Sequence, residues 1–362
     1  MPLVAHNNLP TFKRLREEGR IVLRPGEALN QEIRGLHIGL LNMMPDAALQ
    51  ATERQFFRLV GESNPIAQFY VHPFTLPVFK RGEKAQQHID QHYSSFEQIQ
   101  ELGLDALIIT GANVTQPHLP DEDFWEPLSE VFHWAHENVT STLCSCLATH
   151  ASLELHHQQP RRHLSKKRWG VYSHRVTDQS HPLVHGINTR FDVPHSRFNQ
   201  IDFAQFKKAG LHVLARSEEA GVQLAVSADG FRTVYFQGHP EYDSISLLKE
   251  YKREVGLFAL AYNKGENIGY PPFPANYFNK FTQAIFNEYQ YRLMTAIDAS
   301  AEVPHFPEAL VLEHIDNSWH DTGAAIMANW MGLVYQVTNV ERALPFMDGV
   351  DPDDPLGIYA KT

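Results

Sequence analysis

Residues 139–155 of the 362-residue chain join a β-branched, apolar half to a half rich in Ala and Leu. This change of composition predicts a buried strand that turns sharply into a helix. Cys146 lies at the turn. Its neighbours Cys144, Ser145 and Ala148 are small, as a tight strand-to-helix elbow requires. A thiol there faces the helix N-terminus, which favours the thiolate. The segment fits a cysteine nucleophile, but it fits a buried structural cysteine equally well.

Strands and helices alternate through the first half of the chain. A strand is expected at residues 36–42 and a helix at 47–59, where apolar side chains recur at helical spacing. The strand at 105–110 precedes a helix at 121–137 and then the elbow, whereas residues 72–92 read as irregular and polar. This order is typical of an α/β fold with a mostly parallel sheet and helices on both faces.

The pattern changes in the second half of the chain. Between about residues 170 and 236, short strands follow one another with few helices, which predicts an antiparallel extension of the sheet. Added C-terminal helices are expected at residues 244–262, 276–297 and 323–335. We therefore expect one domain over residues 1–342 and a loose, acidic tail over 343–362.

The charge balance restricts the partners that the chain can bind. With 31 Lys and Arg against 42 Asp and Glu, the formal net charge is −11, which does not favour nucleic acid or an anionic membrane. No apolar run reaches transmembrane length, and no cationic–apolar signal stands at the N-terminus. Cys144 and Cys146 point to opposite faces of a strand, so a disulfide between them is not expected. A cytoplasmic protein is predicted.

A cysteine nucleophile needs a base, because a free thiol is only slightly ionised at neutral pH. His239 is the strongest candidate among 21 histidines, since it follows a predicted strand and Glu241 stands two residues later. In extended backbone this spacing puts both side chains on one face, where the carboxylate can fix the imidazole tautomer for the thiol. A solvated turn in which these residues do nothing is the alternative.

An oxyanion hole needs backbone N–H groups that point at the developing negative charge. The N–H of Leu147, directly after the nucleophile, is one donor by the geometry of the elbow. We expect the second from the loop at Gly111 and Ala112, because it leaves a neighbouring parallel strand at the same carboxyl edge. No metal is expected: His156 and His157 diverge on a helix, and no Cys or carboxylate completes a set with His163.

Segments spread in one order along the chain resemble homoserine O-acyltransferases of the homoserine O-succinyltransferase type. The resemblance extends from about residue 1 to residue 340 and rests on QEIR at 31–34, LNMMP at 41–45, TGA at 110–112, TSTLCSC at 140–146, PHSR at 194–197, GHPEYD at 238–243, NW at 329–330 and VYQ at 334–336. It implies a fold similar to class I glutamine amidotransferases, acyl-CoA as a co-substrate without a further cofactor, and a homodimer.

The resemblance also implies ping-pong chemistry in the first committed step of methionine biosynthesis. Cys146 takes the acyl group from acyl-CoA as a thioester, and the hydroxyl of L-homoserine then attacks it. His239 deprotonates first the thiol and later the hydroxyl, while Glu241 orients the imidazole.

Three further residues match substrate-binding positions of the family: Lys167, Ser196 and Arg253. A guanidinium suits the carboxylate of homoserine, although Arg253 also fits a charge on a helix surface. Lys167 belongs to a basic run at 161–168, which reads as a solvated loop or a nucleic-acid contact. We expect a substrate or CoA-phosphate contact for Lys167 and assign no role to the rest of the run.

The chain departs from the family at three places. Asp46-Ala47 replaces a lysine pair, so the role of a cation there is missing or supplied elsewhere. Residues 276–317 have no counterpart in shorter members and read as a helical insertion. In the family, glycine at position 115 goes with succinyl-CoA and glutamate with acetyl-CoA, because a glutamate repels the succinyl carboxylate. Thr115 adds no charge and its hydroxyl can bond that carboxylate, so we predict succinyl-CoA, with acetyl-CoA as the alternative.

Other activities remain to be separated from this one. A glutamine amidotransferase-like thiol hydrolase shares the fold but usually places glycines around the cysteine, where this chain has Cys144 and Ala148. A non-catalytic binding protein would not need Cys146, His239 and Glu241 together. Serine differs from homoserine by one methylene, which is worth only about 1–3 kcal/mol in a pocket, so the acceptor stays open.

Overall fold

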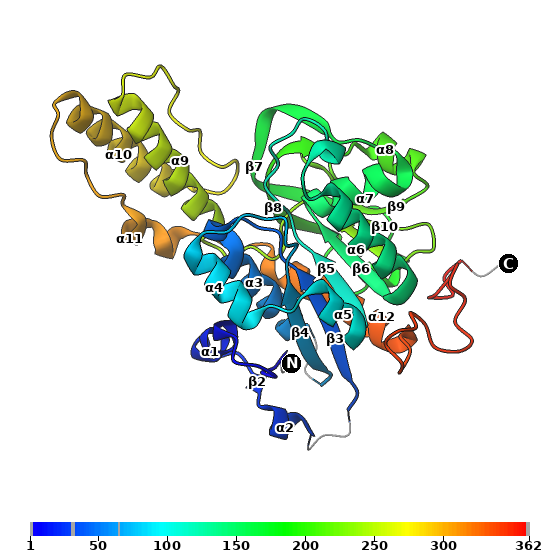
Figure 1. The fold of residues 1–362 in the computed structure, drawn as a ribbon. Helices are drawn as coiled ribbons and strands as arrows, with labels where there is room; N and C mark the ends of the chain where they lie inside the picture. The colour runs from blue at the N-terminus through cyan, green and yellow to red at the C-terminus, as the bar shows by residue number, and fades with distance from the viewer. Residues whose placement is uncertain (1–2, 30–32, 64–65, 360–362) are drawn as a thin grey trace.

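A computed structural model describes residues 3–29, 33–63 and 66–359, and the strands of these residues form a single eleven-stranded sheet (Figure 1). The strands are β1 (Leu3–Val4), β2 (Val22–Leu23), β3 (Gly35–Leu41), β4 (Gln68–Phe74), β5 (Ala106–Ile109), β6 (Ser141–Ser145), β7 (Arg162–Val176), β8 (Arg190–Gln200), β9 (His212–Ser217), β10 (Gly221–Val226) and β11 (Thr233–Phe236). The α-helices are α1 (Pro10–Glu17), α2 (Pro25–Leu29), α3 (Asp46–Glu62), α4 (Glu83–His92), α5 (Phe96–Leu102), α6 (Trp125–Asn138), α7 (Leu147–His157), α8 (Phe203–Lys208), α9 (Ser246–Asn263), α10 (Lys280–Asp298), α11 (Glu308–Val311) and α12 (His320–Val337). Short 3-10 turns lie at Leu119–Asp121, Pro182–Val184 and Leu312–His314.

The sheet has a parallel part and an antiparallel part. Its strand order is β2-β1-β4-β3-β5-β6-β11-β10-β9-β7-β8. The strands from β2 to β11 pair in parallel, and those from β10 to β8 pair antiparallel with their neighbours. The predicted α/β fold, a mostly parallel sheet with an antiparallel extension, is confirmed.

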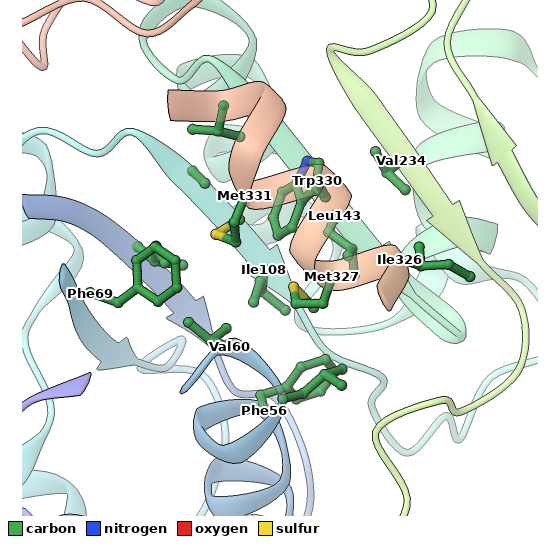
Figure 2. Close-up of a cluster of buried hydrophobic side chains, with 14 of the residues drawn as sticks. Phe56, Val60, Phe69, Ile108, Leu143, Val234, Ile326, Met327, Trp330 and Met331 are labelled. Carbon is green, nitrogen blue, oxygen red and sulfur yellow. The ribbon is translucent and has the colours of Figure 1, made fainter. Parts of the chain in front are cut away.

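Both faces of the parallel part are covered by helices. In β5, Ala106 and Ile108 belong to one apolar cluster and Leu107 and Ile109 to another, because side chains alternate along a strand. Helices α1, α3 and α12 complete the first cluster, and Figure 2 shows α12 lying across the strands with Trp330 turned toward them. Helices α5, α6, α7 and α8 complete the second. Because the helices cover the two faces of the sheet, the site forms at the carboxyl edge of its parallel strands.

Helices α9 and α10 project from the rest of the molecule as a pair (Figure 1). They share a third apolar cluster, in which Tyr251 of α9 and Phe286 of α10 pack with Trp169 and Val171 of β7. The segment 276–317, predicted as a helical insertion, contains α10, α11 and a 3-10 turn. The insertion therefore supports the start of α9, which contributes to the site described below.

Two segments differ from their sequence-based expectation. Residues 83–92 form helix α4 rather than an irregular segment. The prediction failed because this helix is largely solvent-exposed and is held by contacts with distant residues: buried His88 lies 2.8 Å from the carboxylate of buried Glu53, and the N-cap Gly82 donates to Asp46 at 2.8 Å. The basic run at 161–168 is mostly strand β7 and not a loop, since β8 pairs with it.

The described part of the acidic tail, expected to be loose, contacts the body of the molecule. Phe346 is 9% exposed, and its carbonyl accepts a hydrogen bond from Asn339. Tyr359 stacks on His212, with ring centroids 4.9 Å apart. Residues 360–362 of the tail, and Gln31 and Glu32 of the family resemblance, lie outside the described residues. Among the described helices, none has the length and apolar character needed to cross a membrane.

Candidate active site

Cys146 lies at the carboxyl end of β6 in a backbone conformation that few side chains adopt. Its φ is 53° and its ψ −106°, immediately before the first residue of α7. Such a conformation costs about 1–3 kcal/mol and persists only where surrounding contacts enforce it. Here the N–H of Cys146 donates to the carbonyl of Phe236 at 2.8 Å, and its carbonyl accepts from the N–H of Thr149 at 3.1 Å. The elbow predicted from the sequence is thus present.

The loop after β5 passes directly beside this elbow. A Cβ added to Gly111 would lie 3.8 Å from the Cβ of Cys146 and 4.0 Å from the backbone nitrogen of Leu147. Gly111 and the first residue of α7 therefore lie next to each other beside Cys146. An oxyanion hole needs backbone N–H groups near this position, so the predicted donors Leu147 and Ala112 stay a prediction.

His239 and Glu241 lie at the end of β11, the strand that pairs in parallel with β6. Nδ1 of His239 is 2.8 Å from Oε1 of Glu241, and both side chains are buried. Burial favours the neutral imidazole, but the charges of Glu241 and Cys146 and hydrogen bonds to both outweigh it, so the pKa of His239 is well above its usual value. The ring of Tyr242 stacks on that of His239 at 4.4 Å. The structure brings the three predicted catalytic side chains together.

Helix α3 holds the segment that carries His239 and Glu241. Nη2 of Arg58 donates to the carbonyl of Glu241 at 2.9 Å, and its Nη1 pairs with Asp243. Arg54, one helical turn earlier, also pairs with Asp243. The pKa of Asp243 is lowered because these guanidinium groups outweigh the effect of burial.

Because Gly238 has no side chain, the segment that carries His239 and Glu241 can lie close to β8 and β10. A Cβ there would lie 2.6 Å from Oε1 of Gln223 and 2.8 Å from Nε2 of His195. His195 is buried, and burial together with the charge of Arg197 holds its pKa well below the usual value. A side chain at position 238 would displace either this neutral ring or the backbone of His239.

Arg197 is a buried cation that interacts electrostatically with Cys146. Its guanidinium donates to the carbonyls of Asn199 at 2.9 Å and Ala220 at 2.5 Å, and to Nδ1 of His195 at 3.3 Å. Burial lowers its pKa to about 10, and the charge of Cys146 acts in the opposite direction. Arg197 therefore stays charged at neutral pH.

Lys167 and Ser196 meet at Glu250 of α9. Oε2 of Glu250 accepts from Oγ of Ser196 at 2.6 Å and lies 3.2 Å from Nζ of Lys167. Oε1 accepts from the hydroxyl of Tyr242 at 3.0 Å. Nζ of Lys167 also lies 4.4 Å from the ring centroid of Trp169. Tyr242 thus connects this polar cluster to the imidazole of His239.

Arg253 lies outside this cluster. Its side chain is 61% exposed and donates to Glu254 at 2.9 Å. It is nonetheless three residues from Glu250 on α9, so the two side chains occupy neighbouring positions on one helix surface. The structure places Arg253 at the rim of the polar cluster.

Thr115 is exposed, but its polar groups are engaged. Its N–H donates to Glu122 at 2.6 Å and its hydroxyl donates to the same carboxylate at 3.1 Å; the N–H of Gln116 donates to it at 2.7 Å. The nearby guanidinium of Arg161 donates to the carbonyl of Gln116 at 2.8 Å. The hydroxyl expected to bond a succinyl carboxylate therefore bonds Glu122 in this structure.

A cation stands beside Asp46 although the lysine pair is absent. Nη1 of Arg81 lies 3.3 Å from the Asp46 carboxylate and donates to the carbonyl of Met44 at 2.6 Å. The Arg81 side chain is 4% exposed. The positive charge near this loop comes from a different element than the sequence comparison suggested.

The second thiol has no part in this site. Cys144 is fully buried, and burial raises its pKa far above that of a free thiol. Both cysteines are free. Cys144 is therefore a packing residue of the core.

Sequence reasoning gave no role to Arg197 and Glu250. Arg197 lies in the PHSR segment noted above, and Glu250 lies one helical turn before Arg253. Only the fold shows that Arg197 is buried within electrostatic reach of Cys146 and that Glu250 joins Lys167 to Ser196.

Comparison with known proteins shows the family of the chain. A family model described as homoserine O-succinyltransferase matches residues 2–340. The chain is similar to the homoserine O-succinyltransferase of Nitrosococcus oceani, with 62% identity over 362 residues and 100% of both chains covered. It is also similar to that of Methylobacter tundripaludum, with 63% identity over 358 residues, 99% of this chain and 100% of the other.

Among solved structures, a glutamine amidotransferase from Thermotoga maritima resembles 83% of this chain and 98% of its own, with 9% identity and a TM-score of 0.45. The sequence matches are far stronger and extend over the full length of the relatives. The chain belongs to the homoserine O-succinyltransferase family.

Proposed function

We propose that the chain transfers a succinyl group from succinyl-CoA to the hydroxyl of L-homoserine through a thioester on Cys146. The observation that carries this proposal is the arrangement of Cys146, His239 and Glu241 at one sheet edge in a chain of this family. The chemistry uses side chains and backbone groups only and needs no cofactor besides the acyl-CoA co-substrate.

In the first half-reaction, the Cys146 thiolate attacks the thioester carbonyl of succinyl-CoA. His239 holds the proton taken from the thiol, and Glu241 keeps its Nδ1–H oriented. The N–H groups of Leu147 and Ala112 are proposed to stabilise the oxyanion. Collapse breaks the bond to CoA, whose sulfur leaves with the proton from His239 and leaves a succinyl thioester on Cys146.

In the second half-reaction, His239 takes the proton from the hydroxyl of homoserine as its oxygen attacks the thioester. The bond to Cys146 breaks, and the thiolate is restored beside the protonated imidazole. The carboxylate of Glu250 suits the ammonium group of the amino acid. Lys167 and Arg253, one beside it and one a helical turn further on, suit the α-carboxylate.

The donor is proposed to be succinyl-CoA, and the names of the relatives support this. The carboxylate of Glu122 beside Thr115 does not argue against it, because three donors and the nearby Arg161 offset its charge. A direct comparison of succinyl-CoA and acetyl-CoA at equal concentration, each with homoserine and with serine, tests the assignment. We expect the highest kcat/KM for succinyl-CoA with homoserine; a preference for acetyl-CoA contradicts the donor, and a preference for serine contradicts the acceptor.

The kinetic order tests the mechanism apart from the substrates. A thioester intermediate predicts parallel double-reciprocal lines when donor and acceptor are varied, and donor-dependent release of CoA without homoserine. Intersecting lines with no CoA release contradict it. Glutaminase activity in the purified protein would instead support the amidotransferase-like alternative.

We propose a homodimer as the working assembly. In support, Leu257 and Leu260 are 53% and 63% exposed at adjacent positions on α9, an apolar surface of the kind that docks against a protein partner. Sedimentation equilibrium tests this, and a monomer at micromolar concentration contradicts it.

A further inference from the structure

Three arginines lie side by side across the antiparallel part of the sheet. In the strand register, Arg175 of β7 is opposite Arg190 of β8 on one side and opposite Arg216 of β9 on the other. Directly opposite residues on antiparallel strands project to the same face, with Cβ atoms about 5 Å apart. Like charges at that spacing destabilise a sheet. A negatively charged group bound beside the three arginines would therefore offset their mutual repulsion.

The protein supplies no such partner to these three side chains. All three are exposed, and no carboxylate of the described residues lies within 4 Å of their guanidinium groups. Arg190 donates to the hydroxyl of Ser173 at 2.7 Å, and Arg216 stacks over Phe203 at 4.6 Å. In a chain of net charge −11, three unpaired cations in a row stand out from the average surface.

The three side chains line a cavity of about 860 Å³. Arg168 lines the same cavity, and its buried Nε has no hydrogen-bond partner among the described residues. Glu218, Glu219 and Asp202 also border it, and Asp202 pairs with Arg162. Four arginines against three carboxylates leave the cavity with a small net positive charge, and its volume suits a ligand the size of a nucleotide.

This cavity opens at the same sheet edge as the nucleophile. Strands β6 and β11 end at this edge of the sheet. Strand β10 runs antiparallel to β11 and therefore begins at this edge, and β9, which is antiparallel to β10, ends there. Arg216 lies near that end of β9. Strand β7 pairs with β9 through Arg175 and Val176, at the end of β7. The earlier part of β7 and the strand β8 therefore extend beyond this sheet edge, where Lys167 and Ser196 lie.

The separation between the arginines and the polar cluster can be read along β8. Arg190 and Ser196 are six residues apart and project to the same face of that strand, which places their Cα atoms about 20 Å apart. Coenzyme A carries its thiol and its phosphates at opposite ends of a long pantetheine arm. Such a molecule can present its thioester near Cys146 while its phosphates lie among the arginines.

We propose that Arg175, Arg190 and Arg216 form the binding site for the phosphate groups of the acyl-CoA donor. The 3′-phosphate and pyrophosphate of its nucleotide end accept charge-assisted hydrogen bonds from these guanidinium groups. This inference rests on the proposed function, because it takes acyl-CoA as the donor. It assigns no role in the chemical step to the three residues.

The test compares two donors in single variants Arg175→Gln, Arg190→Gln and Arg216→Gln. Succinyl-CoA carries the phosphates, and succinyl-pantetheine lacks them. Loss of one charge-assisted contact is expected to raise the KM for succinyl-CoA about tenfold. The KM for succinyl-pantetheine is expected to be the same in the variants and the natural protein. Lys207→Gln and Lys208→Gln remove a charge from exposed positions on α8 outside the cavity lining, and are expected to leave both values unchanged.

The variants are expected to fold, because removing one of three adjacent like charges does not destabilise the sheet; thermal unfolding without ligand checks this. Unchanged KM for succinyl-CoA, or an equal rise for both donors, overturns the proposal. Free phosphate that stabilises the natural protein without competing with succinyl-CoA also overturns it. An inactive natural protein refutes the proposed function instead, and calorimetry of CoA binding to the natural protein and the variants then decides this site independently.

Discussion

Replacing Arg58 by glutamine tests how the fold positions the catalytic pair. Arg58 and Arg54 both bind Asp243, but only Arg58 also donates to the carbonyl of Glu241. Arg58→Gln removes a buried charge-assisted contact, worth about 1.5–3 kcal/mol of unfolding free energy. It also frees the backbone that carries Glu241 and His239. Since a misplacement of about 1 Å at a catalytic group can cost about a hundredfold in rate, we expect kcat to fall about 10- to 100-fold.

Arg54→Gln is the matched control for this variant. It removes the ion pairs of Arg54 with Asp243 and Glu18 and leaves the bond from Arg58 to Glu241 in place, so we expect kcat within about twofold of the natural protein and a stability loss of about 1 kcal/mol. Steady-state kinetics with succinyl-CoA and homoserine and urea unfolding measure both quantities. Equal losses of kcat in the two variants, or an unchanged kcat in Arg58→Gln, would refute the view that α3 aligns the pair.

Three further predictions concern single residues elsewhere in the chain. Gly238→Ala is expected to cost about 1–3 kcal/mol of stability and to lower kcat, because the new Cβ overlaps His195; denaturant unfolding and kinetics check this, and a fully active variant contradicts it. Hydrogen bonding to Glu62 raises the pKa of His320, so its stabilising effect is complete below about pH 6.5 and is lost as the pH rises through the raised value. Because Glu62 must also be ionised, the stability difference between the natural protein and His320→Gln should be largest between about pH 4.5 and 6.5, and a difference that keeps growing above pH 6.5 contradicts this. Titration with a thiol reagent should label one thiol in the folded protein and two after denaturation, because Cys144 is buried; two fast thiols in the folded state contradict this.

The elbow and the catalytic pair were predictable because their signals are local. Small residues around Cys146 permit a tight turn. His239 and Glu241 pair across two residues as predicted, but in a turn in which the N–H of Tyr242 donates to the carbonyl of His239, not in the extended backbone that the prediction assumed. Helix α5 also has a local signal in the sequence, since Ser95 and Gln98 form a capping box at its start. Interactions within a few residues can be read from sequence alone.

Other features depend on contacts between distant parts of the chain. Strand β8 is an edge strand with a proline at position 194 and several charged residues, so its sequence does not have the pattern of a strand. Glu250 meets Lys167 across 83 residues of sequence and Ser196 across 54. The three-arginine row exists only in the register of β7, β8 and β9. No local pattern contains this information.

The covalent intermediate is the most direct test of the proposed mechanism. The natural protein is mixed with succinyl-CoA without homoserine, digested at acidic pH and mapped by mass spectrometry. We expect one succinyl group on the peptide that contains Cys146, its loss on addition of homoserine, and no adduct in Cys146→Ala. Full turnover by Cys146→Ala, or a succinyl group on another residue that homoserine removes at the turnover rate, would contradict the assignment of Cys146 as the acyl carrier.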